Sequence, residues 1–401
     1  MANTTSERPY DVVLIGATGF TGALTAQYLV DNGGAARIAL AGRNRDKLAA
    51  VTERIGAEVP LLHADLDDPS SLRALAESTR VVASTVGPFI RHGEPLVAAC
   101  AAAGTDYADI TGEPEFVDEM YVRHHATAVE HGARLVHCCG FDSIPHDLGA
   151  QFTVEQLPEG VPLTIDGYVR AGAQFSGGTL DSALTAFSRM RGSAQVASQR
   201  RKLEGRPDGR RVHGARGVPR RVGGAVGWAL PLPTIDPQIV LRSARALERY
   251  GPDFTYGHWA AIKKLPVAVA SGIALPSLVL AAQVPPLRKA LVDRVAKPGT
   301  GPDEQRRQKS WFKVRFEGVA GGDGAGAPGA GDGGGPVRVV TEVAGGDPGY
   351  TETAKMLGES ALCLAHDDLP QLSGQLTTAV AMGGALRQRL QRAGITFSVV
   401  G

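Results

Sequence analysis

Three glycines near the start of the chain have a spacing that can bind phosphate. Gly16, Gly19 and Gly22 lie in the segment VVLIGATGFTG, directly after a short apolar run. In such a pattern the first glycine permits a tight turn, the second lets the backbone approach a pyrophosphate, and the third lets a helix pack close to the strand. The helix start then offers free N–H groups and a positive dipole end to the phosphates. The pattern predicts a dinucleotide site that also includes Thr18, Phe20 and Thr21.

Two alternatives remain open for this segment: a purely structural glycine turn, and a flavin or nucleotide-sugar site on the same fold. The next strand decides which nicotinamide cofactor fits. An NAD site has an acid at the end of its second strand, whereas this chain reads AGRNR there, with Arg43 at that position. An arginine can pair with a 2′-phosphate. The sequence therefore favours NADPH, although a solvated arginine at a helix start is the simpler alternative.

Two further segments follow predicted strands on the same side. Asp65 is placed to meet the adenine edge, or else to cap the next helix. Gly87 and Pro88, in the segment STVGPF, are expected to pass the nicotinamide ribose, because ligands collect at the carboxyl ends of parallel strands.

The elements that must position these residues alternate between strand and helix up to about residue 150. We expect strands at 11–15, 37–41, 59–62, 81–85, 107–110 and 134–138, and helices at 21–30, 46–55, 70–77, 94–103 and 143–156. This alternation is typical of a parallel α/β sheet of the Rossmann type. Residues 1–140 are assigned to this cofactor-binding domain.

The pattern changes in the second part of the chain. A strand at 163–171, a helix at 179–203 and two antiparallel strands at 311–319 and 337–344 predict a second, α+β domain over residues 141–365, built on an antiparallel sheet. A loop at 318–335 has 10 glycines in 18 positions and is too glycine-rich to build a core. Helices are expected at 351–365 and 376–393, so that a helical segment over 366–401 returns to the first domain.

Charge and cysteine usage limit the function classes. The chain has 401 residues and a net charge of +1, which argues against a dedicated nucleic-acid binder. Its four scattered cysteines fit a reducing compartment, and the first residues show no signal-peptide pattern. We expect a cytoplasmic protein, with a contact to the plasma membrane as one option.

Two segments bear on that option. Residues 189–221 hold eleven Lys or Arg against only Glu204 and Asp208. This stretch is either a solvated face or a docking face for an anionic lipid surface or an acidic carrier domain. Residues 265–287 carry no charge, and they could form core, cover an acyl tunnel, or dip into a membrane as an apolar helical hairpin.

Several catalytic patterns are absent from the sequence. No tyrosine has a lysine four residues later, there is no Gly-x-Ser-x-Gly turn, and no metal-ligand spacing such as Cys-x-x-Cys or His-Glu-x-x-His occurs. These absences argue against a short-chain reductase, a serine hydrolase and a metal hydrolase. We therefore predict no metal site.

Taken together, the motifs resemble a known family. GATGFTG with AGR, STVGPF, YADITGE at 107–113, CCGFDSIPHDLG at 138–149 and GGDPGYTETAKMLGESALCL at 345–364 are similar to those of saccharopine dehydrogenase-like oxidoreductases, in particular the trans-acting enoyl reductases of actinobacterial lipid and polyketide pathways. The resemblance spans nearly the whole chain. It departs from the family pattern at His146, where relatives usually carry serine, and at Thr377-Thr378, where Thr-Pro is usual.

The resemblance implies an NADPH-dependent reduction of a carbon–carbon double bond on a small-molecule or carrier-bound acyl intermediate, and it leaves a homodimer open. The reaction needs a proton for Cα and hydrogen-bond donors for the thioester oxygen. Tyr107, Ser143 and His146 are the catalytic candidates, and Asp142 either orients His146 or caps the helix near Ser143. The alternatives are a structural role for each of these residues, a non-catalytic NADP-binding protein that associates with lipid or a partner, and imine chemistry on amino acids.

Overall fold

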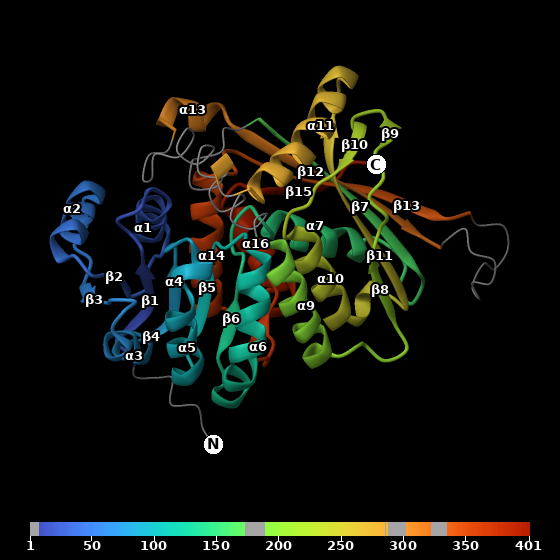
Figure 1. Ribbon diagram of the computed structural model, residues 1–401. Coiled ribbons are helices and arrows are strands. Elements are labelled where there is room, and N and C mark those ends of the chain that lie inside the picture. Colours follow the sequence, from blue (N-terminus) through green and yellow to red (C-terminus); the bar gives the residue numbers. More distant parts are fainter. Residues whose placement is uncertain (1–7, 173–188, 285, 288–301, 322–334) are drawn as a thin grey trace.

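The computed structural model describes residues 8–172, 189–284, 286–287, 302–321 and 335–401. Within these residues the chain forms two β-sheets with helices packed around and between them (Figure 1). The first sheet takes six of its seven strands from the N-terminal part, and the second sheet comes from the rest of the chain.

The first sheet has seven strands, all parallel, in the order β14-β6-β5-β4-β1-β2-β3. In chain order its strands are β1 (Tyr10–Ile15), β2 (Ile38–Gly42), β3 (Leu61–His63), β4 (Thr79–Ser84), β5 (Asp106–Asp109), β6 (Arg134–Val136) and β14 (Gly374–Leu376). The six strands expected from the sequence are all present. The seventh, β14, is contributed by the C-terminal segment.

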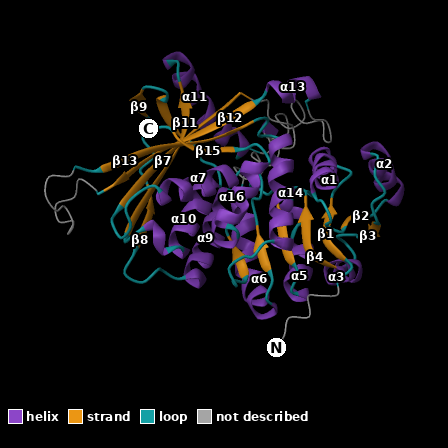
Figure 2. Ribbon diagram, turned by 180° about the vertical axis from the view of Figure 1, so that it is seen from behind, coloured by secondary structure: helices purple, strands orange, loops and turns teal. Residues whose placement is uncertain are grey.

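Helices cover both faces of this sheet because its strands are apolar on both sides. Along β1, Val12 and Leu14 face one hydrophobic cluster while Val13 and Ile15 face another. The first cluster is covered by α1 (Phe20–Asn32), α2 (Arg45–Ile55) and α14 (Thr351–His366). The second is covered by α3 (Pro69–Ser78), α5 (Glu94–Ala103) and α6 (Pro114–His131). Figure 2 shows α14 beside this sheet, seen from behind.

The second sheet is mixed, in the order β15-β13-β12-β7-β11-β10-β9, with β8 paired to β11. Its strands are β7 (Leu163–Gly172), β8 (Arg211–Gly214), β9 (Arg220–Gly223), β10 (Gly227–Pro231), β11 (Asp253–Ile262), β12 (Trp311–Ala320), β13 (Val337–Gly345) and β15 (Thr396–Val399). The predicted antiparallel pair is confirmed: β12 and β13 run from Phe312 opposite Gly345 to Ala320 opposite Val337. Two pairs in this sheet, β7–β11 and β8–β11, are parallel.

The remaining helices link the two sheets or extend from them. They are α4 (Phe89–His92), α7 (Ile144–Glu155), α9 (Met190–Glu204), α10 (Asp236–Ala246), the 3-10 turn η2 (Glu248–Tyr250), α11 (Leu265–Ala282), α13 (Glu304–Lys309), α15 (Thr378–Ala381) and α16 (Gly383–Arg392). Helix α7 packs on β12, β13 and β7, and α9 packs on α6. No helix among the described residues is long and apolar enough to cross a membrane.

Several predicted boundaries were wrong near the C-terminus. The single helix expected at 376–393 is a strand end followed by the short α15 and α16, because Gly383 has φ +40° and interrupts the helical path. The last residues form β15, which pairs with β13. The segment 366–401 therefore contributes a strand to each sheet, and α14, assigned by sequence to the second domain, covers the first sheet.

Two other predictions fall partly outside the described residues. The helix predicted at 179–203 corresponds to α9 from residue 190 onwards, and residues 173–188 are not described. Residues 322–334 of the glycine-rich loop likewise lie outside the described part. Of the segment 265–287, for which an apolar helical hairpin was one prediction, residues 265–282 form the single helix α11, and residue 285 is not described.

A buried network of ion pairs and hydrogen bonds connects α6, α9, α10 and β14. Arg200 pairs with Asp118 at 2.6 Å, and Arg242 donates to Glu204 and to Gln375, each at 2.8 Å. These arginines are among the least exposed charges in the protein. Because a buried charge is tolerated only when paired, this network fixes where the second part of the chain docks on the first.

Candidate functional site

A cavity of about 520 Å³ lies at the carboxyl ends of β1, β2 and β4. The predicted cofactor residues on its lining are Gly16, Thr18, Gly19, Arg43, Asp65 and Gly87. The carboxyl edge of a parallel sheet, at the point where strand order reverses between β1 and β4, is where this fold binds ligands.

Two of the three glycines are required by close approach of the backbone. Gly16 has φ +94°, and a Cβ there would lie 2.5 Å from Oγ1 of Thr85. A Cβ on Gly22 would lie 2.1 Å from the carbonyl oxygen of Gly16. A Cβ on Gly19 would meet only that same oxygen, at an ordinary 3.4 Å. Gly19 lines the cavity, so its small size serves a ligand there and not the packing of α1.

The N-terminus of α1 opens into this cavity without a competing anion. No side chain caps the helix, and its first turn contains no acid. The free N–H groups and positive dipole end are thus available to a phosphate group. This arrangement fits the pyrophosphate of a dinucleotide.

The end of β2 carries positive charge. Arg43 is exposed on the cavity lining, next to Asn44 and Lys47, and it forms no ion pair with a described residue. The Asn44 side chain accepts a hydrogen bond from the backbone N–H of Lys47 at 2.9 Å and so begins α2. A 2′-phosphate fits this corner, whereas the carboxylate that would bind a 2′-hydroxyl is missing from the strand end.

The structure distinguishes the two interpretations of Asp65, a contact to the adenine edge and a cap of the next helix. The residue that caps α3 is Asp68, whose carboxylate accepts from Ser70 N at 2.9 Å. Asp65 instead lines the cavity, and its carboxylate accepts from Asp67 N at 3.1 Å within the same turn. Its position agrees with a contact to the adenine edge.

The loop after β4 is held from behind by a buried acid that the sequence analysis did not single out. Glu113 accepts hydrogen bonds from Phe89 N at 3.0 Å and Ile90 N at 2.9 Å. Burial raises the pKa of Glu113, an effect partly opposed by these two hydrogen bonds. Glu113 thereby positions the segment from Thr85 to Pro88 against the cavity.

Four predicted cofactor residues do not line the cavity. Phe20 packs edge-on against Tyr350, with ring centroids 4.9 Å apart. Thr21 and Gly22 belong to the first turn of α1, and Pro88 follows the cavity-lining Gly87 through a cis peptide bond. These four residues lie next to residues that line the cavity. Leu66, Asp67 and His92 do line the cavity, although the sequence did not predict them as cofactor residues.

Two of the three catalytic candidates lie in the core. Tyr107 is fully buried in the hydrophobic cluster under α5 and α6, and its ring packs edge-on against His137. Ser143 is also fully buried, and its hydroxyl donates to the carbonyl oxygen of Asp142 at 2.6 Å. Neither side chain reaches the cavity, and we assign no reaction step to either.

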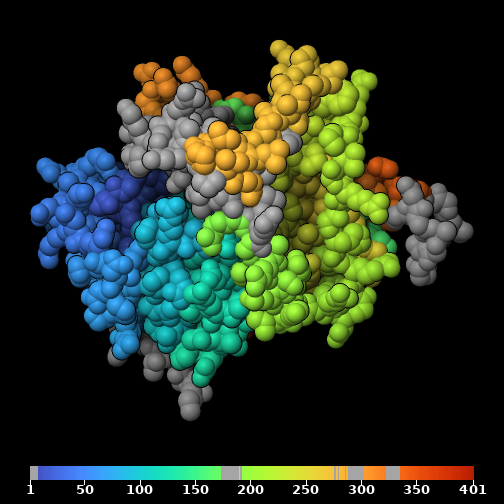
Figure 3. All heavy atoms as spheres, in the orientation of Figure 1, coloured from blue at the N-terminus to red at the C-terminus, as the bar shows by residue number. Residues whose placement is uncertain are grey.

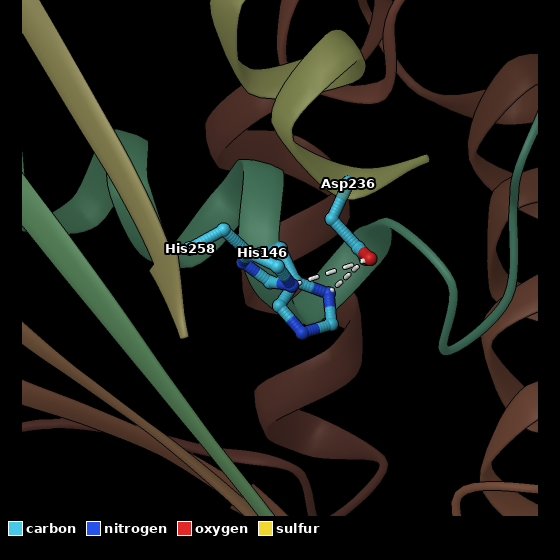
Figure 4. Close-up of side chains that lie close together, drawn as sticks. All are labelled: His146, Asp236 and His258. Carbon is cyan, nitrogen blue, oxygen red and sulfur yellow. Dashed lines mark ion pairs between the residues drawn. The ribbon is translucent and has the colours of Figure 1, made fainter. Parts of the chain in front are cut away.

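The third candidate, His146, belongs to a buried cluster that three separate elements bring together (Figure 4). His146 lies in the first turn of α7, Asp236 in the first turn of α10, and His258 on β11. Nδ1 of His146 is 2.6 Å from Oδ1 of Asp236, and Nε2 of His258 is 3.5 Å from Oδ2. Tyr256 OH is 3.2 Å from Nδ1 of His258.

The electrostatics of this cluster favour an ionised carboxyl group. Burial alone would raise the pKa of Asp236, but its two imidazole neighbours outweigh burial and hold the pKa far below the ordinary value of 3.8. Burial lowers the pKa of His258, partly opposed by Asp236.

The same three residues also present a donor set that zinc uses. Their ligand atoms lie within 4.8 Å of one another. Two ligands of a tetrahedral zinc ion are separated by roughly 3.3 Å, however, and Nδ1 of His146 and Oδ1 of Asp236 are closer than that, at 2.6 Å. Neither atom makes a well-aligned hydrogen bond to a described residue. The absence of a metal site stays a prediction.

Asp142 is the accessible carboxyl group at this edge of the sheet. It is exposed, although residues 143–150 after it are all buried. A Cβ on Gly112, just past the end of β5, would lie 2.7 Å from Oδ2 of Asp142. The carboxyl thus lies beside the strand next to β4, whose loop lines the cavity. Although the side chain is open to solvent, the protein packed around it and the charge of Asp236 raise the pKa of Asp142 to about 6, opposed in part by His146.

Comparison with known proteins agrees with this geometry. Residues 12–136 match the family described as the saccharopine dehydrogenase NADP binding domain. A Mycobacterium tuberculosis protein, provisionally named a trans-acting enoyl reductase, is 38% identical over 98% of each chain. A trans-acting enoyl reductase of Mycobacterium bovis (strain BCG) is 36% identical, again over 98% of each chain.

Among solved structures, apo saccharopine dehydrogenase (L-Glu forming) from Saccharomyces cerevisiae aligns with a TM-score of 0.55 at 12% identity. The alignment covers 98% of this chain and 100% of that one. At this identity the likeness shows the fold alone. Both sheets are included in it.

Proposed function

Because this chain belongs to the family of saccharopine dehydrogenase-like oxidoreductases that contains the trans-acting enoyl reductases, we propose that it reduces the carbon–carbon double bond of an acyl thioester with NADPH. The observation that carries the proposal is an accessible acid, Asp142, at the same sheet edge as the NADP cavity. Reduction of an enoyl thioester needs both a hydride donor and a proton donor.

The residues present fit NADPH. The free N-terminus of α1 and the unsubstituted Gly19 suit the pyrophosphate, and Arg43 suits the 2′-phosphate. When bound, NADPH supplies the hydride. The loop at Thr85–Gly87, held by Glu113, would orient the nicotinamide end toward the carboxyl edge of β5.

The proton is assigned to Asp142. Addition of hydride at Cβ of an enoyl thioester moves the electron pair of the double bond into a thioester enolate. Protonation of the enolate at Cα then gives the saturated thioester, and the cofactor is left as NADP⁺. A carboxyl group with a pKa of about 6 is partly protonated near neutral pH, which suits a general acid. The charge of Asp236 disfavours the carboxylate form of Asp142, whereas His146 favours it, so the pair would set how readily Asp142 gives up its proton.

The proposal is tested by NADPH oxidation with a series of 2-enoyl thioesters, presented on pantetheine and on an acyl-carrier protein. We expect consumption of NADPH in step with a product that is heavier by two hydrogen atoms. The saturated thioesters serve as a control for NADPH oxidation that is not coupled to reduction of a double bond.

Two outcomes would contradict the proposal. NADPH that binds but is not oxidised by any enoyl thioester would indicate a non-catalytic NADP-binding protein. Turnover that instead requires an amino acid with an oxo acid would indicate imine chemistry.

A further inference from the structure

Helix α11 exposes an apolar surface that the proposed reaction does not use. The helix projects beyond the second sheet (Figure 1), and the space-filling view shows it at the outer edge of the molecule (Figure 3). Among its described side chains, only Ala268 and Ala282 are buried. Ile273 is 66% exposed and Leu280 is 69% exposed. Leu265, Val267 and Val269 are exposed as well.

An exposed apolar surface of this kind marks a contact with another apolar phase. The distribution of residues around α11 indicates which phase. No charged residue occurs between Leu265 and Leu287, and the exposed apolar side chains are not balanced by a polar stripe. A helix that docks in a protein groove keeps one polar face toward water. A helix apolar on all sides suits a medium that is apolar in every direction, such as the acyl region of a bilayer.

The topology requires that α11 contact a membrane from one side only. Strand β11 precedes α11 and strand β12 follows it in the chain, and both strands belong to the second sheet. The chain must leave the sheet and come back to it on the same side of any membrane. An 18-residue helix is about 27 Å long, more than the roughly 15 Å of hydrocarbon in one leaflet, so α11 would lie at a slant within it.

Basic residues surround the base of α11. Lys263 and Lys264 immediately precede the helix and are exposed. Arg221 on β9 is opposite Trp228, which is itself opposite Ile262, the last residue of β11. None of these three cations forms an ion pair with a described residue. Lysine and arginine at this position suit the anionic headgroups of a bilayer.

Part of the basic stretch at 189–221 is engaged within the fold. Arg189, Arg200, Arg211 and Arg220 pair with acids, and Arg210 donates to backbone carbonyl groups of residues 244–251. Unpaired positive charge is present at the base of α11, and also further along the stretch, where Arg201, Lys202, Arg206 and Arg216 are exposed and form no ion pair with a described residue. From the apolar helix and this basic base together, we propose that α11 inserts into one leaflet of an anionic phospholipid bilayer and holds the protein at its surface.

The full-length protein is tested by flotation with vesicles of phosphatidylcholine containing 30% phosphatidylglycerol. We expect flotation with these vesicles, and at least tenfold less with pure phosphatidylcholine. Ile273→Asp and Leu280→Asp should each reduce the floated fraction at least tenfold. Leu372→Asp is the matched control, because Leu372 is an exposed leucine, 45% accessible, that precedes β14 in the first sheet.

A second measurement locates the inserted residue. The four native cysteines are all buried, so a cysteine introduced by Ile273→Cys can be labelled selectively with an environment-sensitive fluorophore. With anionic vesicles its emission should shift to the blue and be quenched by brominated acyl chains. The label on Leu372→Cys should show neither effect.

Two results would overturn the proposal. One is an unchanged emission of the Ile273 label with anionic vesicles. The other is a dimer in sedimentation that Ile273→Asp converts to a monomer, because α11 would then bind a second copy of the chain. NADPH binding, measured on every variant, confirms that the chain is folded, and the membrane test does not depend on which substrate the enzyme reduces.

Discussion

Nδ1 of His146 lies 2.6 Å from Oδ1 of Asp236, with both side chains almost completely buried. The pair joins the first turn of α7, which follows the cofactor-binding sheet, to the first turn of α10, which packs on the second sheet. His258 approaches the other carboxylate oxygen from β11. A single carboxylate thus connects the two parts of the chain directly behind the proposed acid, Asp142.

Removal of the Asp236 charge should destabilise the fold at neutral pH. The pKa of Asp236 is lowered on folding, so its contribution to the free energy of unfolding is fully present above about pH 4 and is lost as the pH falls through the folded-state pKa. We expect Asp236→Asn to lose about 3 to 5 kcal/mol at pH 7 and less at pH 3. Urea unfolding at both pH values measures the difference.

The control for that variant is Asp208→Asn, an exposed acid in the loop after α9. Its unfolding free energy should differ little from the parent at either pH. An equal loss for Asp236→Asn at pH 7 and pH 3 would mean that the carboxylate charge does not stabilise the cluster.

The assignment of Asp142 as acid predicts the pH dependence of turnover. With a pKa of about 6, the protonated carboxyl that the step needs predominates at low pH. We therefore expect kcat to be highest below about pH 6 and to fall about tenfold per pH unit above it. Asp142→Asn should lower kcat at least about 100-fold, with the Kd for NADPH unchanged.

A kcat for Asp142→Asn within a few-fold of the parent would remove Asp142 from the mechanism. A profile that stays flat from pH 5 to pH 8 in the parent enzyme would do the same. His146→Asn should show a smaller loss than Asp142→Asn, since His146 is buried behind the acid.

Six of the seven strands of the first sheet could be predicted from the sequence, because most of them are short apolar runs that end near a glycine or a polar turn. The cofactor site followed from it, since Gly16, Gly19 and Arg43 all lie where a strand ends and a helix begins. In this part of the chain, local pattern and tertiary contact agree.

The features that could not be predicted depend on contacts between segments that are distant in the sequence. The pairing of β14 with β6 joins residues near 375 to residues near 135, and nothing local in the segment GQL indicates it. Asp236 and His258 had no signal at all, because the cluster is assembled from three elements far apart in sequence. Tyr107 was a plausible acid by type, yet its position on β5 directs it into the core.

The third glycine of the motif should be intolerant of any side chain. A Cβ on Gly22 would lie 2.1 Å from the Gly16 carbonyl oxygen, so α1 must move away from the turn. We expect Gly22→Ala to lower the free energy of unfolding by about 3 kcal/mol and to abolish NADPH binding. Gly384→Ala, whose Cβ would have no neighbour closer than 4.0 Å, is the control and should leave both unchanged.

The four thiols should be unreactive in the native state. Cys100, Cys138, Cys139 and Cys363 are buried, and burial raises the pKa of each. Because the thiolate is the reactive form, we expect no reaction with Ellman's reagent until the chain is unfolded in guanidinium, when all four react. A thiol that reacts rapidly in the folded protein would place one of these cysteines at an accessible site.

The preference for NADPH over NADH should depend on Arg43. Loss of a charge-assisted hydrogen bond to the 2′-phosphate weakens binding by about 1.5 to 3 kcal/mol, so Arg43→Ala should raise the Kd for NADPH roughly 10- to 100-fold. The Kd for NADH, which lacks that phosphate, should change less than about threefold on the same scale. Arg45→Ala is the matched control, because Arg45 is two residues further on and does not line the cavity. Titration of cofactor fluorescence measures the Kd of each cofactor for each variant. If Arg43→Ala weakened the binding of NADPH and NADH equally, Arg43 would stabilise the loop and would not bind the 2′-phosphate.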